Sequence, residues 1–170
     1  MLKLNDVLSE QTVDYVIQMI KEDILEIKKL MEKCKHNCKI IAKIENVMLA
    51  RTIGVGFLVN LDLKLNFVNE VKTLISESVT NAIVHGCLND EKKRVNFNLY
   101  YDDVNVYIEV EDFGVGIADI DKAKEPLYST KVDEERAGLG FTIMDVFSDK
   151  LEIKSKINEG TKVIMVKRYK

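Results

Sequence analysis

The N-terminal part of the chain carries apolar residues at the spacing of a single helix. Six of them are separated alternately by four and three positions: Val13, Ile17, Ile20, Ile24, Ile27 and Met31. This narrow apolar stripe is typical of a heptad seam. The seam is too short to stand alone as a coiled coil. We therefore expect residues 1–37 to form a helical extension that packs on its own domain or on a second copy of the chain.

Apolar spacing predicts three elements in the next fifty residues. Isoleucines favour a short strand over residues 38–44, and a helical pattern follows over residues 46–60. A stronger helical pattern begins after Asn66, which we expect to cap the helix, and it closes at Gly86.

The second half of the chain alternates apolar and polar positions with the period of strands. Residues 95–101 and 104–110 predict a hairpin. A loop of about twenty residues follows, from residue 114 to residue 136. A loop of this length inside a compact domain is usually functional or mobile.

One more helix and two strands complete the predicted fold. The helix begins near Gly138, and strands at 151–153 and 163–165 are joined by a turn at 158–160. Helices therefore come first along the chain, followed by strands with one helix between them. This order favours an α+β fold, a two-layer α/β sandwich over residues 38–170, rather than a doubly wound parallel sheet.

Composition narrows the classes of function. The net charge of −3 argues against direct binding to nucleic acid, because such proteins usually carry a strongly basic patch. Three cysteines are an odd number, and they lack the spacing of a disulfide framework. No signal-peptide pattern begins the chain, and no stretch approaches the roughly 20 apolar residues that span a bilayer. We expect a cytoplasmic protein without membrane contact.

Two polar residues on the strongest helix suggest a cation site. Glu77 and Asn81 are four positions apart, so they project from the same helix face. A carboxylate and a carboxamide placed in this way offer oxygen ligands to Mg²⁺ and a candidate base. Taken alone, the pair is also explained by a solvated helix face.

An aspartate and nearby glycines mark the end of the second predicted strand. Asp112 is followed by Gly114 and Gly116, which permit the close approach of a flat ligand, although a plain turn explains them as well. The carboxylate of Asp112 could accept a hydrogen bond from an exocyclic amine. Thr161, after Gly160, could support Asp112 from the neighbouring strand, although a simple hairpin also explains it.

A second glycine pair leads directly into a helix. Gly138 and Gly140 follow Arg136, and backbone amides at a helix N-terminus form an anion site suited to phosphate. Arg136 could add a charged contact to the terminal phosphate. A single Gly-x-Gly of this kind is weak evidence by itself.

The four motifs in this order resemble the GHKL ATP-binding superfamily, the fold shared by gyrase, heat-shock protein 90, histidine kinases and MutL. Three segments are similar to the anti-sigma factor serine kinases in particular: SESVTNAIVHG at 76–86, EPLYSTK at 125–131 and GLGFTIM at 138–144. The resemblance runs from about residue 40 to the C-terminus. The N-terminal helix is an addition that the minimal family domain lacks.

The resemblance implies a role for each matching residue, with ATP and Mg²⁺ as ligands. Glu77 would be the general base, Asn81 would hold Mg²⁺, and Arg51 would contact a partner protein. The remaining residues would bind the nucleotide, with Asp112 and Thr161 at the adenine and the others along the loop and phosphates: Asp112, Gly114, Gly116, Thr130, Arg136, Gly138, Gly140 and Thr161.

The family also implies partners. Such a protein binds a sporulation-type sigma factor when it is loaded with ATP, acts as a homodimer, and phosphorylates a serine of an anti-anti-sigma protein. Two other interpretations stay open: a nucleotide-gated sigma-binding module without kinase turnover, and a histidine-kinase-like ATPase domain. The extra helix could remake the dimer interface, cover the sheet edge or bind a different partner.

Overall fold

The computed structural model describes residues 12–22, 35–125 and 138–170. The chain divides into two compact units, Met1–Cys34 and Lys35–Lys170. In the first unit, residues 12–22 are helical and every one of their side chains is exposed. The rest of the N-terminal seam, from Ile24 to Met31, lies outside the described residues.

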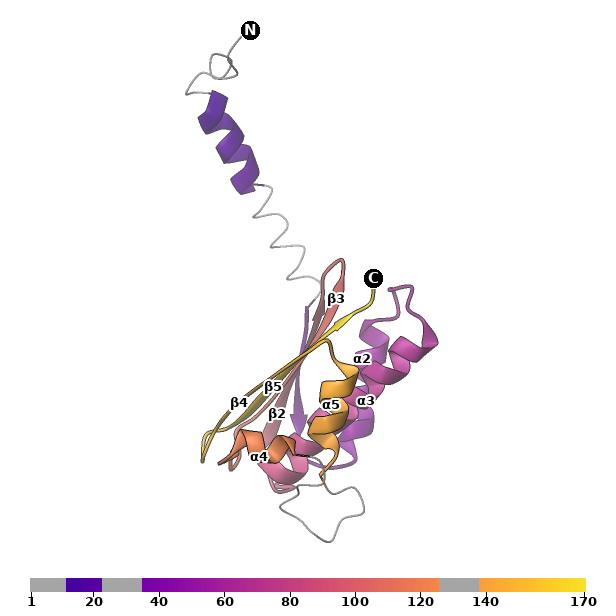
Figure 1. Cartoon of the computed structure of the whole chain (residues 1–170), viewed down its shortest axis with the longest axis vertical. Coiled ribbons are helices and arrows are strands. Elements are labelled where there is room, and N and C mark those ends of the chain that lie inside the picture. Colours follow the sequence, from indigo (N-terminus) through magenta and orange to yellow (C-terminus); the bar gives the residue numbers. More distant parts are fainter. Residues whose placement is uncertain (1–11, 23–34, 126–137) are drawn as a thin grey trace. The chain divides into compact units, whose positions relative to one another are not determined.

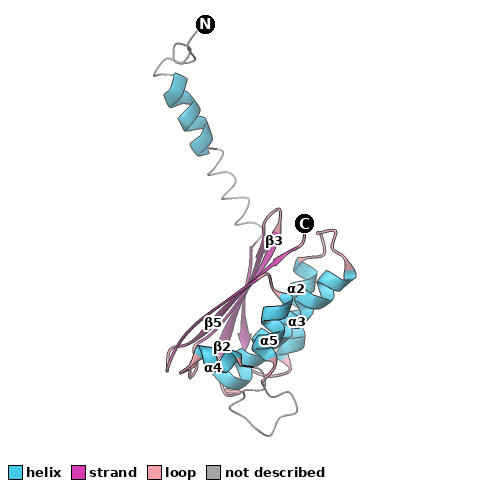
Figure 2. Ribbon diagram, in the orientation of Figure 1, coloured by secondary structure: helices cyan, strands magenta, loops and turns pink. Residues whose placement is uncertain are grey.

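The second unit is built on one antiparallel sheet (Figures 1 and 2). Its spatial order is β1-β2-β3-β5-β4, and every neighbouring pair is antiparallel. In chain order the strands are β1 Lys35–Ile41, β2 Arg94–Tyr101, β3 Asn105–Asp112, β4 Lys150–Lys156 and β5 Gly160–Arg168.

Helices cover one face of this sheet and form the second layer (Figure 2). They are α2 Asn46–Phe57, α3 Leu65–Asn81, the π-helical turn η2 Ala82–Gly86, the short α4 Ile120–Lys124 and α5 Gly140–Phe147. The α+β two-layer sandwich expected from the sequence is confirmed.

Alternation along the strands explains why the helices gather on one face. The inward positions of β2 and β3 are fully buried, among them Phe97, Leu99 and Ile108, and they meet Leu74 and Ile75 of α3. Intervening positions are only partly buried. Because successive strand side chains point to opposite faces, a single apolar face results, and α3 packs on it as the central helix of the layer.

Several sequence-based boundaries were wrong in detail. The strand expected at 38–44 begins at Lys35, where it pairs with β2. Asn66 is not a cap, because α3 starts one residue earlier and its cap, Lys64, makes no side-chain hydrogen bond. The loop expected from 114 to 136 contains α4, whose first turn is capped by the Asp119 side chain accepting from the Lys122 N–H.

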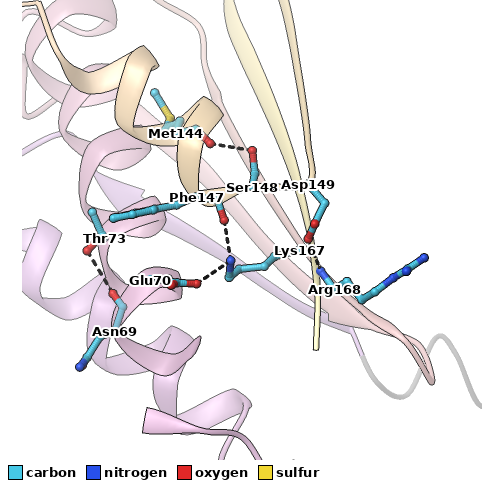
Figure 3. Close-up of polar contacts among 9 residues, drawn as sticks. All are labelled: Asn69, Glu70, Thr73, Met144, Phe147, Ser148, Asp149, Lys167 and Arg168. Atoms are coloured by element: carbon cyan, nitrogen blue, oxygen red, sulfur yellow. Dashed lines mark hydrogen bonds and ion pairs between the residues drawn. The ribbon is translucent and has the colours of Figure 1, made fainter. Parts of the chain in front are cut away.

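A lysine on β5 connects α3 and α5 of the helical layer to the sheet (Figure 3). The ammonium of Lys167 lies 2.6 Å from the Glu70 carboxylate of α3 and donates to the carbonyl of Phe147, the last residue of α5, at 2.7 Å. Its side chain is 12% exposed, so solvent screens this contact less than a surface ion pair. The contact fixes the C-terminal end of α5 against α3.

Candidate functional site

The described residues enclose a cavity of about 550 Å³ at the N-terminal end of α5, opposite to the end that Lys167 contacts. Its walls come from α2, α3, η2 and α4, from the ends of β3 and β5, from residues 115–119, and from the start of α5. The lining includes eight of the candidate site residues named from the sequence: Arg51, Glu77, Asn81, Asp112, Gly116, Gly138, Gly140 and Thr161. Segments that are far apart in the sequence thus meet at one site.

Glu77 and Asn81 lie one helical turn apart on α3 and face the first residue of α5. A Cβ atom added to Gly140 would lie 3.0 Å from Asn81 Nδ2 and 3.3 Å from both Asn81 Oδ1 and Glu77 Oε2. The two polar side chains therefore converge on the helix N-terminus, where backbone amides point outward. The pair faces α5 and lines the cavity, so it is not simply part of a solvated helix face.

Asp112 is a buried acid at the end of β3. It is 3% exposed, and its Oδ1 accepts the backbone N–H of Gly114 at 2.9 Å. Burial raises the pKa of Asp112, and the backbone donors at Gly114 and Thr161 oppose this effect only in part.

Gly114 and Gly116 play different structural parts in the turn after β3. Gly114 packs against the backbone of Gly86, where a Cβ atom would overlap the carbonyl oxygen, and it does not line the cavity. Gly116 lines the cavity with a φ of +72°, which favours glycine. Val115, which lies between the two glycines, donates its backbone N–H to the Gly86 carbonyl at 3.0 Å and joins this turn to η2.

Thr161 approaches the same place from β5. It is paired with Asp112 across the β3–β5 ladder, so the two side chains stand next to each other on one face. Its hydroxyl lies 2.9 Å from the hydroxyl of Ser155 on β4. Ser155 in turn accepts the backbone N–H of Ile117, which lines the cavity.

Gly138 and Gly140 stand at the start of α5, and Gly138 has a φ of +87°. Thr130 and Arg136, which the family resemblance would place at the phosphates, lie outside the described residues. Arg51 lines the cavity from α2, although its expected role is toward a partner protein.

Comparison with known proteins identifies the family. Residues 40–167 match the family of the histidine kinase-like ATPase domain. An anti-sigma F factor of Clostridium perfringens is 42% identical over 134 residues, which cover 79% of this chain and 96% of the relative. One from Geobacillus stearothermophilus is 43% identical over 128 residues, which cover 75% of this chain and 88% of the relative. The chain belongs to the anti-sigma F factor family.

The family is one of GHKL-type serine kinases, so the cavity belongs to an ATP-binding domain. A solved structure shows the same fold: the RsbU and RsbW domains of a Mycobacterium tuberculosis protein align with a TM-score of 0.55 and 20% identity, over 79% of this chain and 32% of that chain. The N-terminal helix lies outside the residues that match the family. Across the described ranges, 12–22, 35–125 and 138–170, no helix has the length and apolarity needed to cross a bilayer.

Two residues of this anti-sigma F family site were missed from the sequence. Gly86 was taken as a helix end, yet a Cβ atom there would overlap the Asp112 carboxylate. Ser155 was not noticed, although the expected turn at 158–160 places it opposite Thr161 in the hairpin, which is the observed register. Counting outward from that turn would have found it.

Proposed function

We propose that this protein is an ATP-dependent inhibitor of a sporulation-type sigma factor and that it phosphorylates a serine of an anti-anti-sigma protein in the cytoplasm. One observation supports the proposal most strongly. This chain, about 42% identical to an anti-sigma F factor, has a carboxylate, Glu77, beside the N-terminus of α5. A module that only bound nucleotide would not need a base there.

In this proposal Glu77 accepts the proton of the attacking seryl hydroxyl. The serine oxygen forms a bond to the γ-phosphorus of ATP, the bond from that phosphorus to the β,γ-bridging oxygen breaks, and ADP leaves. Asp112 and Thr161 bind the adenine, while the amides at Gly138 and Gly140 bind phosphate oxygens. Thr130 and Arg136 are proposed as further phosphate contacts on the strength of the family resemblance.

Mg²⁺ fits the residues near α5. Asn81 offers a carboxamide oxygen next to the amides expected to bind phosphate, and Mg²⁺ commonly combines one or two protein oxygens with phosphates and water. Among the described residues, no three His, Cys, Asp or Glu side chains gather as a metal site. We therefore assign Mg²⁺ to Asn81 together with the nucleotide; bound there, it would neutralise developing phosphate charge.

A pull-down separates the proposal from a different specificity. The tagged chain is incubated with ATP or ADP in lysate of its own sporulating host, and bound proteins and phosphoserine are identified by mass spectrometry. We expect a sigma factor with ATP and a phosphoserine-containing partner. Recovery of neither protein with either nucleotide would refute the assigned partners while leaving ATP binding intact.

Replacing Glu77 with Gln tests the kinase step itself. We expect E77Q to bind ATP and the sigma factor but to phosphorylate the partner at least 100-fold more slowly, the order of loss expected for a general base. Undiminished phosphorylation would show that Glu77 is not the base. A wild-type protein that binds the sigma factor but never transfers phosphate would favour the nucleotide-gated binding module instead.

We further propose that the protein is a homodimer and that residues 1–37 add to its contacts. In the described part of the helix, Val13, Ile17 and Ile20 are each more than 40% exposed. An isolated helix of this length is marginal in water, so a covering partner would stabilise it. Light scattering should show that Ile17→Asn lowers the molar mass or the dimer affinity; an unchanged association constant would exclude the helix from the interface.

A further inference from the structure

Ser155 holds a hydrogen-bonding position behind the cavity rather than in it. Its hydroxyl lies within reach of three groups: the Ile117 N–H at 2.7 Å, the Gly160 carbonyl at 3.0 Å and the Thr161 hydroxyl at 2.9 Å. Ser155 itself is not among the residues that line the cavity, whereas Ile117 and Thr161 are. It can therefore affect a bound ligand only through these neighbours.

The chemistry of the three neighbours fixes where the protons lie. A serine hydroxyl has one proton to donate and two lone pairs to accept with. The Ile117 N–H can only donate, so it occupies one lone pair. The Gly160 carbonyl can only accept, so it takes the serine proton. The remaining lone pair of Ser155 must then accept the proton of Thr161.

Because its proton is donated to Ser155, the Thr161 hydroxyl can act toward the cavity only as a hydrogen-bond acceptor. Its neighbour across the ladder, Asp112, is likewise an acceptor when ionised. The floor of the cavity thus offers acceptors side by side, with the one hydroxyl proton directed away from the ligand. A base that brings an exocyclic amine matches this floor, and a base that brings a carbonyl oxygen at the same position is repelled.

We propose that Ser155 is the positioning residue that makes the site select a 6-amino purine over a 6-oxo purine, by holding the Thr161 hydroxyl as an acceptor. This inference rests on the proposed placement of the adenine at Asp112 and Thr161. Sites built to hydrogen-bond one group discriminate strongly against an analogue that lacks it, because buried polar atoms are left unpaired. Without Ser155, the Thr161 hydroxyl turns and donates into the cavity, and the discrimination falls.

Binding of ATP and inosine triphosphate to the full-length chain tests the inference, since the two nucleotides differ at the 6-position. Their dissociation constants are measured by titration calorimetry for the wild type, S155A, S155T and S148A. Ser148 is the matched control because its hydroxyl also donates to a backbone carbonyl, that of Met144, away from the cavity. We expect the preference for ATP to fall about tenfold in S155A, the worth of one hydrogen bond, and to recover in S155T.

The outcomes separate the inference from the proposal beneath it. An equal loss of affinity for both nucleotides in S155A, or an unchanged ratio, overturns the role of Ser155 while leaving the ATP site in place. If the preference for ATP falls as much in S148A as in S155A, the role of Ser155 is also overturned, because the effect would then not be specific to this position. A wild-type protein that binds neither nucleotide overturns the proposed function.

Discussion

Replacing Gly140 with Ala tests whether the approach of α5 to α3 sets the active geometry. A Cβ atom at this position would lie 3.0 to 3.3 Å from the side chains of Asn81 and Glu77. Such contacts are tighter than ordinary van der Waals distances, so the two polar side chains must move by a few tenths of an ångström. The backbone of Gly140 does not resist the change, since it is helical without a positive φ.

The size of the effect follows from that displacement. A misplacement of about 1 Å at a reacting group can cost on the order of 100-fold in rate. A shift of a few tenths of an ångström then corresponds to about 1 kcal/mol, or a roughly five-fold slower phosphoryl transfer. Folding stability should stay level or rise, because Ala is up to about 1 kcal/mol better than Gly in a helix.

The assay measures single-turnover phosphorylation of the partner recovered with the chain, alongside the free energy of unfolding in urea. Gly56→Ala is the matched control: it also places Ala in a helix, but nothing lies within 4 Å of the added atom. We expect it to be stabilised and fully active. Equal phosphorylation rates for Gly140→Ala and Gly56→Ala would refute the reasoning, as would a rate loss that simply follows a loss of folded protein.

Three further changes probe the layers around the site. Gly54→Ala should lower the free energy of unfolding by about 1–2 kcal/mol in urea, because the new atom overlaps the buried Ile75 side chain; a higher urea midpoint would contradict this overlap. Burial raises the pKa of Asp112, so its contribution to stability is present at low pH and is lost as pH rises through that pKa. Asp112→Asn should therefore flatten the dependence of the unfolding free energy on pH in this range. Parallel pH dependences for the wild type and the variant would contradict the raised pKa. Lys167→Met should cost about 1–2 kcal/mol by removing the contacts to Glu70 and α5, and an unchanged urea midpoint would show that the contact adds nothing.

Much of the fold could be predicted because periodicity and burial agree. The alternation in β2 and β3 and the helical spacing in α3 each have a single apolar face, so element type and layer order follow from the sequence. The residues at which elements begin and end were harder to predict from the sequence. β1 begins at Lys35 because it pairs with β2 along seven residues, and the polar side chains of its first half give no local sign of that distant partner.

The candidate site was predictable as a set of motifs but not as a geometry. The spacing of Glu77 and Asn81 placed both on one helix face, whereas the contact of that face with Gly140 depends on how α5 packs against α3. Ser155 carries no motif at all. Its importance arises from hairpin register and from the count of donors and acceptors around one hydroxyl.

The burial of Asp112 explains why glycines from three distant segments belong to the same site. A Cβ atom at Gly86 would overlap its carboxylate, one at Gly160 would overlap its carbonyl oxygen, and one at Gly114 would overlap the Gly86 backbone. Desolvation raises the pKa of an acid this deeply buried, so it needs hydrogen-bond donors in direct contact to favour its ionised form. The backbone amides of Gly114 and Thr161 reach it in a place where Cβ atoms at Gly86, Gly114 and Gly160 would overlap their surroundings. The glycines and the aspartate therefore form one structural unit. Because the glycines lack side chains, the surrounding backbone packs closely around a carboxylate that can accept a hydrogen bond from an amine.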